Sequence, residues 1–476
     1  MKKYLKMRVF WFFLGCLPLI AVQASADKVI YCYFGSWSCY RPKNGKFIVE
    51  DIDPSLCTHL VYTFVGLEGD NVSILDPWQD LPDSSGKDGF RRFNDLRLKS
   101  PGLKTMIAMG GWNEGSTQYS EMASTLESRR KFINNVVRFI TKYGFNGFDL
   151  DWEYPAQRGG VPEDRENYVA LLKELRLRFD EEGLILSAAV AAAESSASKS
   201  FIIPEISKYL DFINIMAYDF HGAKDPVTGI NAPLRVSRGD APKDRKWNVE
   251  AAVKYWLQQG APKEKLILGM PLYGRTFTLI NSANNSVGAP VRGPGAAGPY
   301  TREPGVLAYN EICESQARGG WKIVFDDERY VPYMSKGNQW VGYDNVKSIA
   351  GKAKLIKDLD LAGAMVWSVD FDDFRGICGE KYPLLKTVNA VLQGRTPVPD
   401  EKTTTQTPGQ PESTPPSSRC EKEGLFPDPH SCGFISCIKN HSGEFIEHAM
   451  QCPPGLCFNP KNKICDWSPN EWILSD

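Results

Sequence analysis

The chain has 476 residues, of which 42% are hydrophobic, a composition typical of a globular protein with room for one large domain and a smaller one. Its 56 lysines and arginines nearly balance its 57 aspartates and glutamates, so the formal net charge is −1. This balance excludes a polycation that binds nucleic acid or an anionic membrane by charge. We therefore expect neither as a partner.

Residues 1–26 have the pattern of a secretory signal peptide. Four basic residues precede an apolar run from Val9 to Val22, and the small residues Ala24-Ser25-Ala26 follow it, so we expect cleavage after Ala26. The alternative is a membrane anchor, but the run is shorter than the roughly 20 residues that span a bilayer. Cleavage would leave 52 basic and 57 acidic residues, a formal net charge of −5.

Cysteine usage agrees with secretion. Eleven of the twelve cysteines would remain after cleavage, and such a number is typical of an oxidising compartment. Three Asn-x-Ser triplets, at Asn71, Asn284 and Asn440, could carry glycans in a secreted protein. Their occupancy is left open by the sequence.

Eight short runs of β-branched or aromatic residues predict β-strands. They lie near residues 28–35, 59–66, 104–111, 147–152, 185–192, 211–218, 266–273 and 363–370. Most precede an amphipathic stretch, such as 128–143 or 165–180, in which apolar residues recur at helical spacing. Eight strand–helix repeats are typical of an α/β (β/α)₈ barrel, although the pattern alone also allows a long open doubly wound sheet.

The spacing between the last two predicted strands is unusual. Their first residues are about 97 positions apart, whereas the other strands follow one another at 26 to 55. Residues from about 275 to 345, rich in Gly, Pro and aromatics, therefore form an insertion. Because it follows the carboxyl end of a strand, it would lie over the face where barrels bind substrate.

Three carboxylates stand two residues apart in and directly after the fourth predicted strand: Asp149, Asp151 and Glu153. Side chains at this spacing share one face of a strand. Crowded and partly buried carboxylates raise the pKa of one acid until it can donate a proton near neutral pH. A solvated edge strand is the alternative, but Phe148, Leu150 and Trp152 make the opposite face apolar, which favours a covered sheet.

The run Asn146 to Pro155 resembles the D-x-x-D-x-D-x-E signature of family-18 glycoside hydrolases, the chitinases, with Glu153 at the proton donor. The first Asp of the pattern is Asn146 here, a departure that bears on the pH optimum. The resemblance covers about residues 28 to 392 and implies a TIM barrel over residues 27–395. It also implies a small α+β subdomain between strands 7 and 8, and no metal or cofactor.

The resemblance implies a role for each residue at a matching position. In this family the N-acetyl group of the substrate attacks in place of an enzyme nucleophile. Glu153 would protonate the glycosidic oxygen and then activate water, Asp151 would orient the acetamide, and Asp149 would share a proton with it. Tyr218, in the run Met216 to Phe220, would bind the acetamide carbonyl.

Further matching positions are expected to bind substrate. Sugar rings have apolar faces that stack on aromatic side chains, and Trp367 matches the floor beneath the scissile sugar. Any single tryptophan could instead be ordinary core. The expected substrate-binding residues are Tyr33, Trp37, Phe64, Pro77, Trp78, Gly110, Gly111, Trp112, Asn113, Tyr154, Met216, Ala217, Asp219, Tyr273, Arg275, Glu303 and Trp367.

The family pattern also implies two disulfides in the barrel, Cys32 with Cys57 and Cys313 with Cys378. It assigns no partner to Cys39, for which we expect a buried unpaired thiol.

A change of composition separates the C-terminal region. Residues 396–419 are rich in Thr, Ser and Pro and are expected to form an extended, O-glycosylated linker. Six cysteines follow in residues 420–476, and three disulfides would stabilise so small a fold better than zinc in a secreted protein.

This region resembles the peritrophin-type chitin-binding module, through Gly424 to Pro427, Cys452 to Leu456 and Cys465-Asp466-Trp467. The resemblance implies that Cys420 pairs with Cys437 and Cys452 with Cys465. Cys432 and Cys457 would then pair, but six cysteines allow 15 connectivities.

We therefore expect a secreted, monomeric chitinase that hydrolyses β-1,4-linked N-acetylglucosamine polymers by a substrate-assisted retaining mechanism. Its partners would be chitin and chitooligosaccharides, and its C-terminal module would target insoluble chitin. The alternatives are a chitin-binding lectin with weak or lost catalysis and a structural protein of chitin matrices. The sequence leaves open whether the enzyme acts in an endo or a processive manner, what its pH optimum is, and what the biological source of its chitin is.

Overall fold

The computed structural model describes residues 28–396, 422–428, 433–439, 445–450, 452 and 456–467. The expected signal peptide, nearly all of the expected linker, and Cys420, Cys432 and Asn440 lie outside these ranges. The chain divides into two compact units between residues 401 and 402, and each is described by itself.

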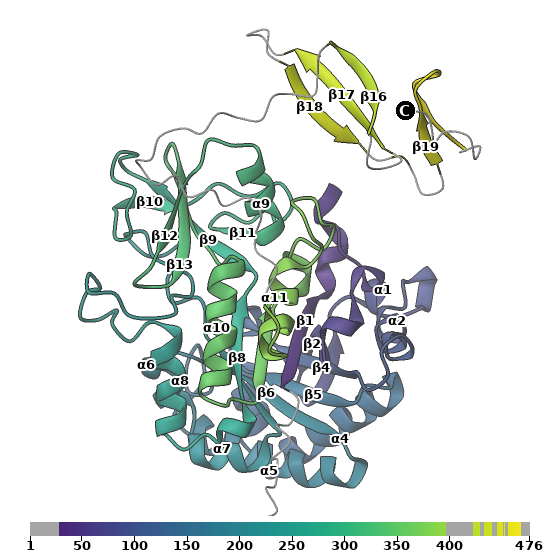
Figure 1. The fold of residues 1–476 in the computed structure, drawn as a ribbon. Helices are drawn as coiled ribbons and strands as arrows, with labels where there is room; N and C mark the ends of the chain where they lie inside the picture. Colours follow the sequence, from purple (N-terminus) through teal and green to yellow (C-terminus); the bar gives the residue numbers. More distant parts are fainter. Residues whose placement is uncertain are drawn as a thin grey trace, which may run out of the picture. The chain divides into compact units, whose positions relative to one another are not determined.

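Eight parallel strands form a closed barrel (Figure 1). In chain order they are β1 (Val29–Gly35), β2 (His59–Glu68), β4 (Lys104–Gly110), β5 (Gly147–Asp151), β6 (Ile185–Ala191), β7 (Phe212–Met216), β8 (Leu266–Pro271) and β15 (Gly363–Trp367). Because β1 pairs in parallel with both β15 and β2, the sheet has no free edge among these eight. The predicted barrel is confirmed, and the open doubly wound alternative is wrong.

Helices cover the outside of the barrel (Figure 1). They are α1 (Pro77–Asp80), α2 (Gly89–Asn94), α3 (Thr117–Ala123), α4 (Leu126–Tyr143), α5 (Asp164–Glu182), α6 (Glu194–Ser200), α7 (Ile203–Tyr209), α8 (Val249–Gln258), α10 (Val346–Asp358) and α11 (Pro383–Leu392). The ends of α4 follow its sequence, since the Thr125 side chain accepts a hydrogen bond from the Ser128 N–H and Gly144 ends the helix at a φ of 78°. Over the described residues, no helix has the length and apolar character needed to cross a bilayer.

The strands separate two hydrophobic cores. The larger core lies between strands and helices, and there Phe148 and Leu150 of β5 join Phe132 and Ile140 of α4. The smaller core fills the barrel interior and consists of Tyr31, Tyr33, Val61, Met106, Ala108, Ile267 and Met365. Phe148 and Leu150 face the helices. Because side chains alternate along a strand, Asp149 and Asp151 must point into the barrel.

A second sheet follows β8 directly, as the strand spacing predicted. Its elements are β9 (Tyr273–Leu279), β10 (Val291–Pro294), β11 (Val306–Ala308), α9 (Tyr309–Ala317), β12 (Lys322–Asp326), β13 (Val331–Lys336) and β14 (Gln339–Gly342). The strands pair antiparallel in the order β10-β9-β14-β13-β12, with β11 also on β9. A further short strand, β3 (Asn71–Ile74), extends β2 as a hairpin.

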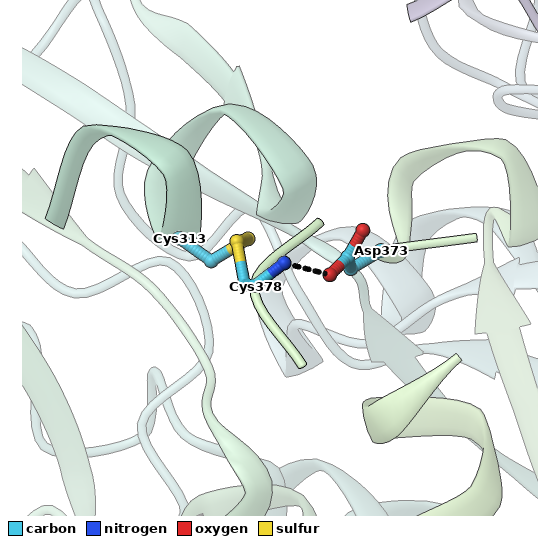
Figure 2. A group of neighbouring side chains, drawn as sticks. All are labelled: Cys313, Asp373 and Cys378. Carbon is cyan, nitrogen blue, oxygen red and sulfur yellow. Dashed lines mark hydrogen bonds between the residues drawn. A yellow bond between two sulfur atoms is a disulfide. The ribbon is translucent and has the colours of Figure 1, made fainter. Parts of the chain in front are cut away.

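Both disulfides expected in the barrel unit are present. Cys32 of β1 is bonded to Cys57 just before β2, and Cys313 of α9 is bonded to Cys378 after β15. Figure 2 shows Asp373 beside the second bond, where its carboxylate accepts the Cys378 N–H at 2.8 Å. Three potential metal ligands thus lie together, but both sulfurs are already bonded to each other.

Cys39 is unpaired and buried, as predicted, and burial raises the pKa of its thiol.

The C-terminal unit consists of short antiparallel strands. These are β16 (Gly424–Pro427), β17 (Phe434–Lys439) and β18 (Phe445–Met450) in one sheet, and β19 (Leu456–Asn459) paired with β20 (Ile464–Trp467). Cys452 is bonded to Cys465, which confirms that expected pair. Cys437 and Cys457 are also disulfide-bonded, whereas their expected partners Cys420 and Cys432 are outside the described residues.

Candidate active site

The three carboxylates are buried at the carboxyl end of β5. Their residues are 0%, 4% and 9% exposed for Asp149, Asp151 and Glu153. Because β5 pairs with β4 on one side and β6 on the other, the alternative of a solvated edge strand is wrong. The strand ends at Asp151, one residue before its predicted end, and Glu153 lies two residues beyond it.

Asp149 is held by donors from three other strands. It accepts hydrogen bonds from the Tyr33 hydroxyl at 2.7 Å, the Ser187 hydroxyl at 2.5 Å and the Asn214 amide at 3.3 Å. Asn214 also donates to the Tyr33 oxygen at 3.0 Å. Burial raises the pKa of Asp149, and the three donors act against that rise. The barrel interior therefore fixes this carboxyl in place.

Asp151 lies between the other two acids in sequence and has fewer hydrogen-bond partners than Asp149. Its Oδ1 is buried and has no hydrogen-bond partner among the described residues. Burial, followed by the charges of Glu153 and Asp149, holds its pKa well above the ordinary value. A carboxyl with an unused oxygen in a dry site can accept or donate a hydrogen bond to a bound ligand.

Glu153 has the protonation behaviour of an acid–base catalyst. Burial raises its pKa to about 7, against a hydrogen bond from Tyr154 and the positive charge of Arg158, while Asp219 adds to the rise. A carboxyl that titrates near neutral pH can donate a proton in one step and recover it in the next.

A polar group follows β7 on the other side of the site. Tyr218 donates its hydroxyl to the sulfur of Met365 at 3.6 Å, and burial holds its pKa well above the ordinary value, so it remains a hydroxyl donor. Asp219 accepts hydrogen bonds from Tyr273 at 2.6 Å and from Arg275 at 2.7 Å. Two expected binding residues of β9 are thereby joined to the β7 end, where Met216 is the last strand residue and Ala217 is buried.

An aromatic cluster forms at the ends of β15, β1 and β2. The Trp367 ring lies 5.6 Å from Tyr33, 5.8 Å from Phe64 and 6.3 Å from Trp37, between centroids. Trp37 is stacked on Phe64 at 6.0 Å yet is 41% exposed. The cluster therefore offers open ring faces beside a buried acid, which is what a carbohydrate site requires.

Two more tryptophans stand on loops at this end of the barrel. Trp78 follows Pro77 in α1 and stacks on Tyr40 at 6.2 Å. Trp112 begins the 3₁₀ turn η7 (Trp112–Glu114). Before it, Gly110 has a φ of 115°, and a Cβ there would lie 2.1 Å from the Asp151 carbonyl oxygen, so a larger residue would displace the acid series.

The remaining expected residues are placed as follows. Gly111 lies against the ring of Phe64, Asn113 is exposed, and Glu303 is exposed between β10 and β11 with its charge acting on Arg275.

Asn146, the departure from the family pattern, lies at the opposite end of β5. Its side-chain oxygen accepts hydrogen bonds from the Thr105 N–H at 3.0 Å and from Arg97 at 3.1 Å. The residue therefore joins β4 to the turn after α2, one strand length away from Glu153.

Several residues of the site were not predicted from the sequence. These are Ser187 and Asn214, which bind Asp149, together with Met365, Tyr40 and Arg158. A signal existed for Asn214, since it is the one polar residue in the apolar strand Phe212 to Met216. An inward-facing polar residue in such a strand needs a partner inside the barrel.

Comparisons with known proteins agree with this geometry. The family described as glycosyl hydrolases family 18 matches residues 29–372, and the chitin binding Peritrophin-A domain matches residues 420–472. Chitotriosidase-1 of Mus musculus is 38% identical, over 95% of this chain and 98% of the relative.

Among solved structures, the Ostrinia furnacalis Group IV chitinase in complex with allosamidin is 46% identical with a TM-score of 0.75, covering 78% of this chain and 100% of that one. A human pseudo-chitinase with retained chitooligosaccharide binding is 39% identical with a TM-score of 0.71, covering 77% and 100%. Because the family match spans most of the chain and the mouse relative aligns along 95% of it, the chain is a glycoside hydrolase that belongs to family 18.

Proposed function

We propose that this glycoside hydrolase is a secreted chitinase that hydrolyses β-1,4-linked N-acetylglucosamine polymers with retention at the anomeric carbon. The observation that carries the proposal is Glu153, a carboxyl buried beside two other acids with its pKa at about 7. The names of its relatives, among them a probable chitinase and an endochitinase of insects and a chitotriosidase of the mouse, support chitin as the substrate.

The proposed mechanism uses the protein's own groups and the substrate's acetamide. Glu153 protonates the leaving oxygen while the acetamide carbonyl oxygen attacks the anomeric carbon, and the bond to the leaving sugar breaks. The unpartnered Oδ1 of Asp151 accepts the acetamide N–H as positive charge develops, and the Tyr218 hydroxyl donates to its carbonyl oxygen. Glu153 then takes a proton from water, which opens the ring intermediate and returns the acid to its first state.

The alternative is a lectin that binds chitooligosaccharides without cleaving them, and one relative is such a pseudo-chitinase. Hydrolysis is favoured here because the donor carboxyl is present as Glu153 and burial raises its pKa to about 7. Release of soluble sugar from colloidal chitin by the full chain separates the two functions, since a lectin would bind the chitin and release none.

The C-terminal unit is proposed to hold the enzyme on insoluble chitin. Support comes from its match to the peritrophin-A domain over residues 420–472 and from its separation as a compact unit. Secretion is supported by the disulfides of both units, because such bonds persist in oxidising compartments.

Replacing the acid tests the mechanism most directly. We expect Glu153→Gln to lower kcat on chitohexaose by at least about 10²-fold, since general acid catalysis contributes roughly 10² to 10⁴, while calorimetry still detects binding of the sugar. Glu163→Gln, at an exposed glutamate on the same loop, is the matched control and should leave kcat unchanged. Retention of more than about a tenth of the activity by Glu153→Gln would contradict the assignment.

The pH dependence follows from the raised pKa of Glu153. The acid must carry its proton to act, so kcat/KM should be high below about pH 6 and fall as the pH rises through about 7, where free Glu153 loses its proton. Asp219 raises this pKa, so Asp219→Asn should move the alkaline limb to lower pH. Rates measured from about pH 5 to 9 check both; an alkaline limb absent up to pH 9 would refute the assignment.

The stereochemistry of the product tests attack by the acetamide. Two successive inversions at the anomeric carbon give net retention, so the first product from a β-linked chain should be the β-anomer. Proton NMR during the first minutes of chitohexaose hydrolysis measures the anomer before mutarotation. An initial α-anomer would exclude the proposed route and indicate direct attack by water.

Truncation tests the independence of the C-terminal unit. A chain that ends at Arg395 keeps all of α11 and should hydrolyse chitohexaose at the full-length rate with the same barrel melting temperature. Its adsorption to particulate chitin should be weaker, because the tethered module raises the local concentration of enzyme at the surface. A clear fall in the melting temperature would show instead that the two units stabilise each other.

A further inference from the structure

Trp112 differs from the other tryptophans of the site in how its ring is held. Trp37 and Trp367 contact each other and neighbouring rings, and Trp78 stacks on Tyr40. Within residues 28–396, no comparable aromatic neighbour is found for Trp112. Its ring is covered instead by the guanidinium of Arg158, whose carbon lies 3.5 Å from the ring centroid.

The main chain beneath Trp112 is fixed by hydrogen bonds that leave the ring itself free. The Gly111 N–H donates to the Asp151 carbonyl at 2.8 Å. Glu114 accepts from the Leu67 N–H at 3.1 Å and from the Tyr119 hydroxyl at 2.6 Å. The indole projects from this base and is 55% exposed, so the contact that sets its orientation is the one with Arg158.

Arg158 also binds the main chain of the acid. One guanidinium nitrogen donates to the Glu153 carbonyl oxygen at 2.9 Å. Ser116 joins the two loops, because its N–H donates to the Arg158 carbonyl at 3.2 Å and its hydroxyl donates to the Tyr154 carbonyl at 2.9 Å. A planar guanidinium can stack on a ring and donate from its edge at once, which a lysine ammonium cannot do.

We propose that Arg158 is a positioning residue that fixes the indole of Trp112 at a set distance from Glu153, so that a sugar stacked on Trp112 is held in register with the acid. The inference rests on the proposed function, since it assigns Trp112 a sugar of the chitin chain. The open face of the ring receives the sugar, and the guanidinium covers the other face. Arg158 therefore acts on binding through Trp112.

A double-mutant cycle with Trp112 tests this role. Dissociation constants for chitohexaose are measured by calorimetry in the Glu153→Gln background, where turnover does not interfere. Arg158→Gln should raise the dissociation constant about three- to fivefold, as expected for an exposed cation–ring contact. In a chain that already carries Trp112→Ala, the same change should have less than about a 1.5-fold effect, because the ring through which it acts is gone.

Two further variants separate positioning from general structural damage. Arg158→Lys keeps a charge over the ring but cannot also make the contact with the Glu153 carbonyl, so it should recover only part of the lost affinity. Lys142→Gln removes a cation 4.8 Å from the Tyr143 ring at the end of α4, away from the site, and should leave affinity unchanged. Melting temperatures show which variants are folded, and Arg158→Lys carries the test if Arg158→Gln is not.

The outcomes distinguish this inference from the proposed function. Equal effects of Arg158→Gln with and without Trp112, or no effect on affinity at all, would overturn the positioning role. If only Arg158→Lys folds, an equal change in the dissociation constant with and without the Trp112 ring would overturn the positioning role in the same way. Failure of the full chain to cleave chitohexaose would refute the proposed hydrolysis, while the binding cycle would still decide the role of Arg158.

Discussion

The burial of three carboxylates inside a closed barrel is the constraint on which the rest of the site depends. Charged acids cannot remain in such an interior without donors or a shared proton. The protein meets this need differently at each acid, with three side-chain donors at Asp149, a raised pKa at Asp151, and the Tyr154 hydroxyl and Arg158 charge at Glu153. Glu153, whose pKa is about 7, is also the most exposed of the three.

Around this acid series, the site divides into an aromatic side and a polar side. β1, β2 and β15 supply the rings that contact Trp367, while β7 and β9 supply the hydroxyl, carboxylate and guanidinium groups linked through Asp219. A sugar unit has apolar faces and a polar rim. Residues at the ends of the barrel strands, together with β9 of the insertion, can therefore contact both.

Much of the fold could be predicted from the sequence because the barrel strands are short, apolar and regularly spaced. All eight were found at nearly their true positions, although the last ends at Trp367 rather than near residue 370. β5 ends at Asp151, one residue before its predicted end, although the alternation of acidic and apolar residues continues to Glu153 in the sequence. Local pattern cannot show where a neighbouring strand ceases to pair.

The donors to Asp149 were missed for a related reason. Tyr33, Ser187 and Asn214 come from three strands separated by up to 181 residues, and only closure of the barrel brings them to one carboxyl. The resemblance supplied Tyr33 as a binding residue but gave no contact for it. The role proposed for Arg158 could not be predicted from the sequence either, because an exposed arginine in a loop belongs to no recurring sequence pattern.

The way the insertion is attached limits how it can move. A single residue, Leu272, separates β8 from β9, and its N–H donates to the Trp367 carbonyl while its own carbonyl accepts from Tyr309. The Cys313–Cys378 bond provides a second, covalent attachment to the loop after β15. The insertion is thus attached to the barrel at its first residue and again through α9, so we expect it to move together with the end of the barrel that carries Trp367 and not as a separate hinged lid.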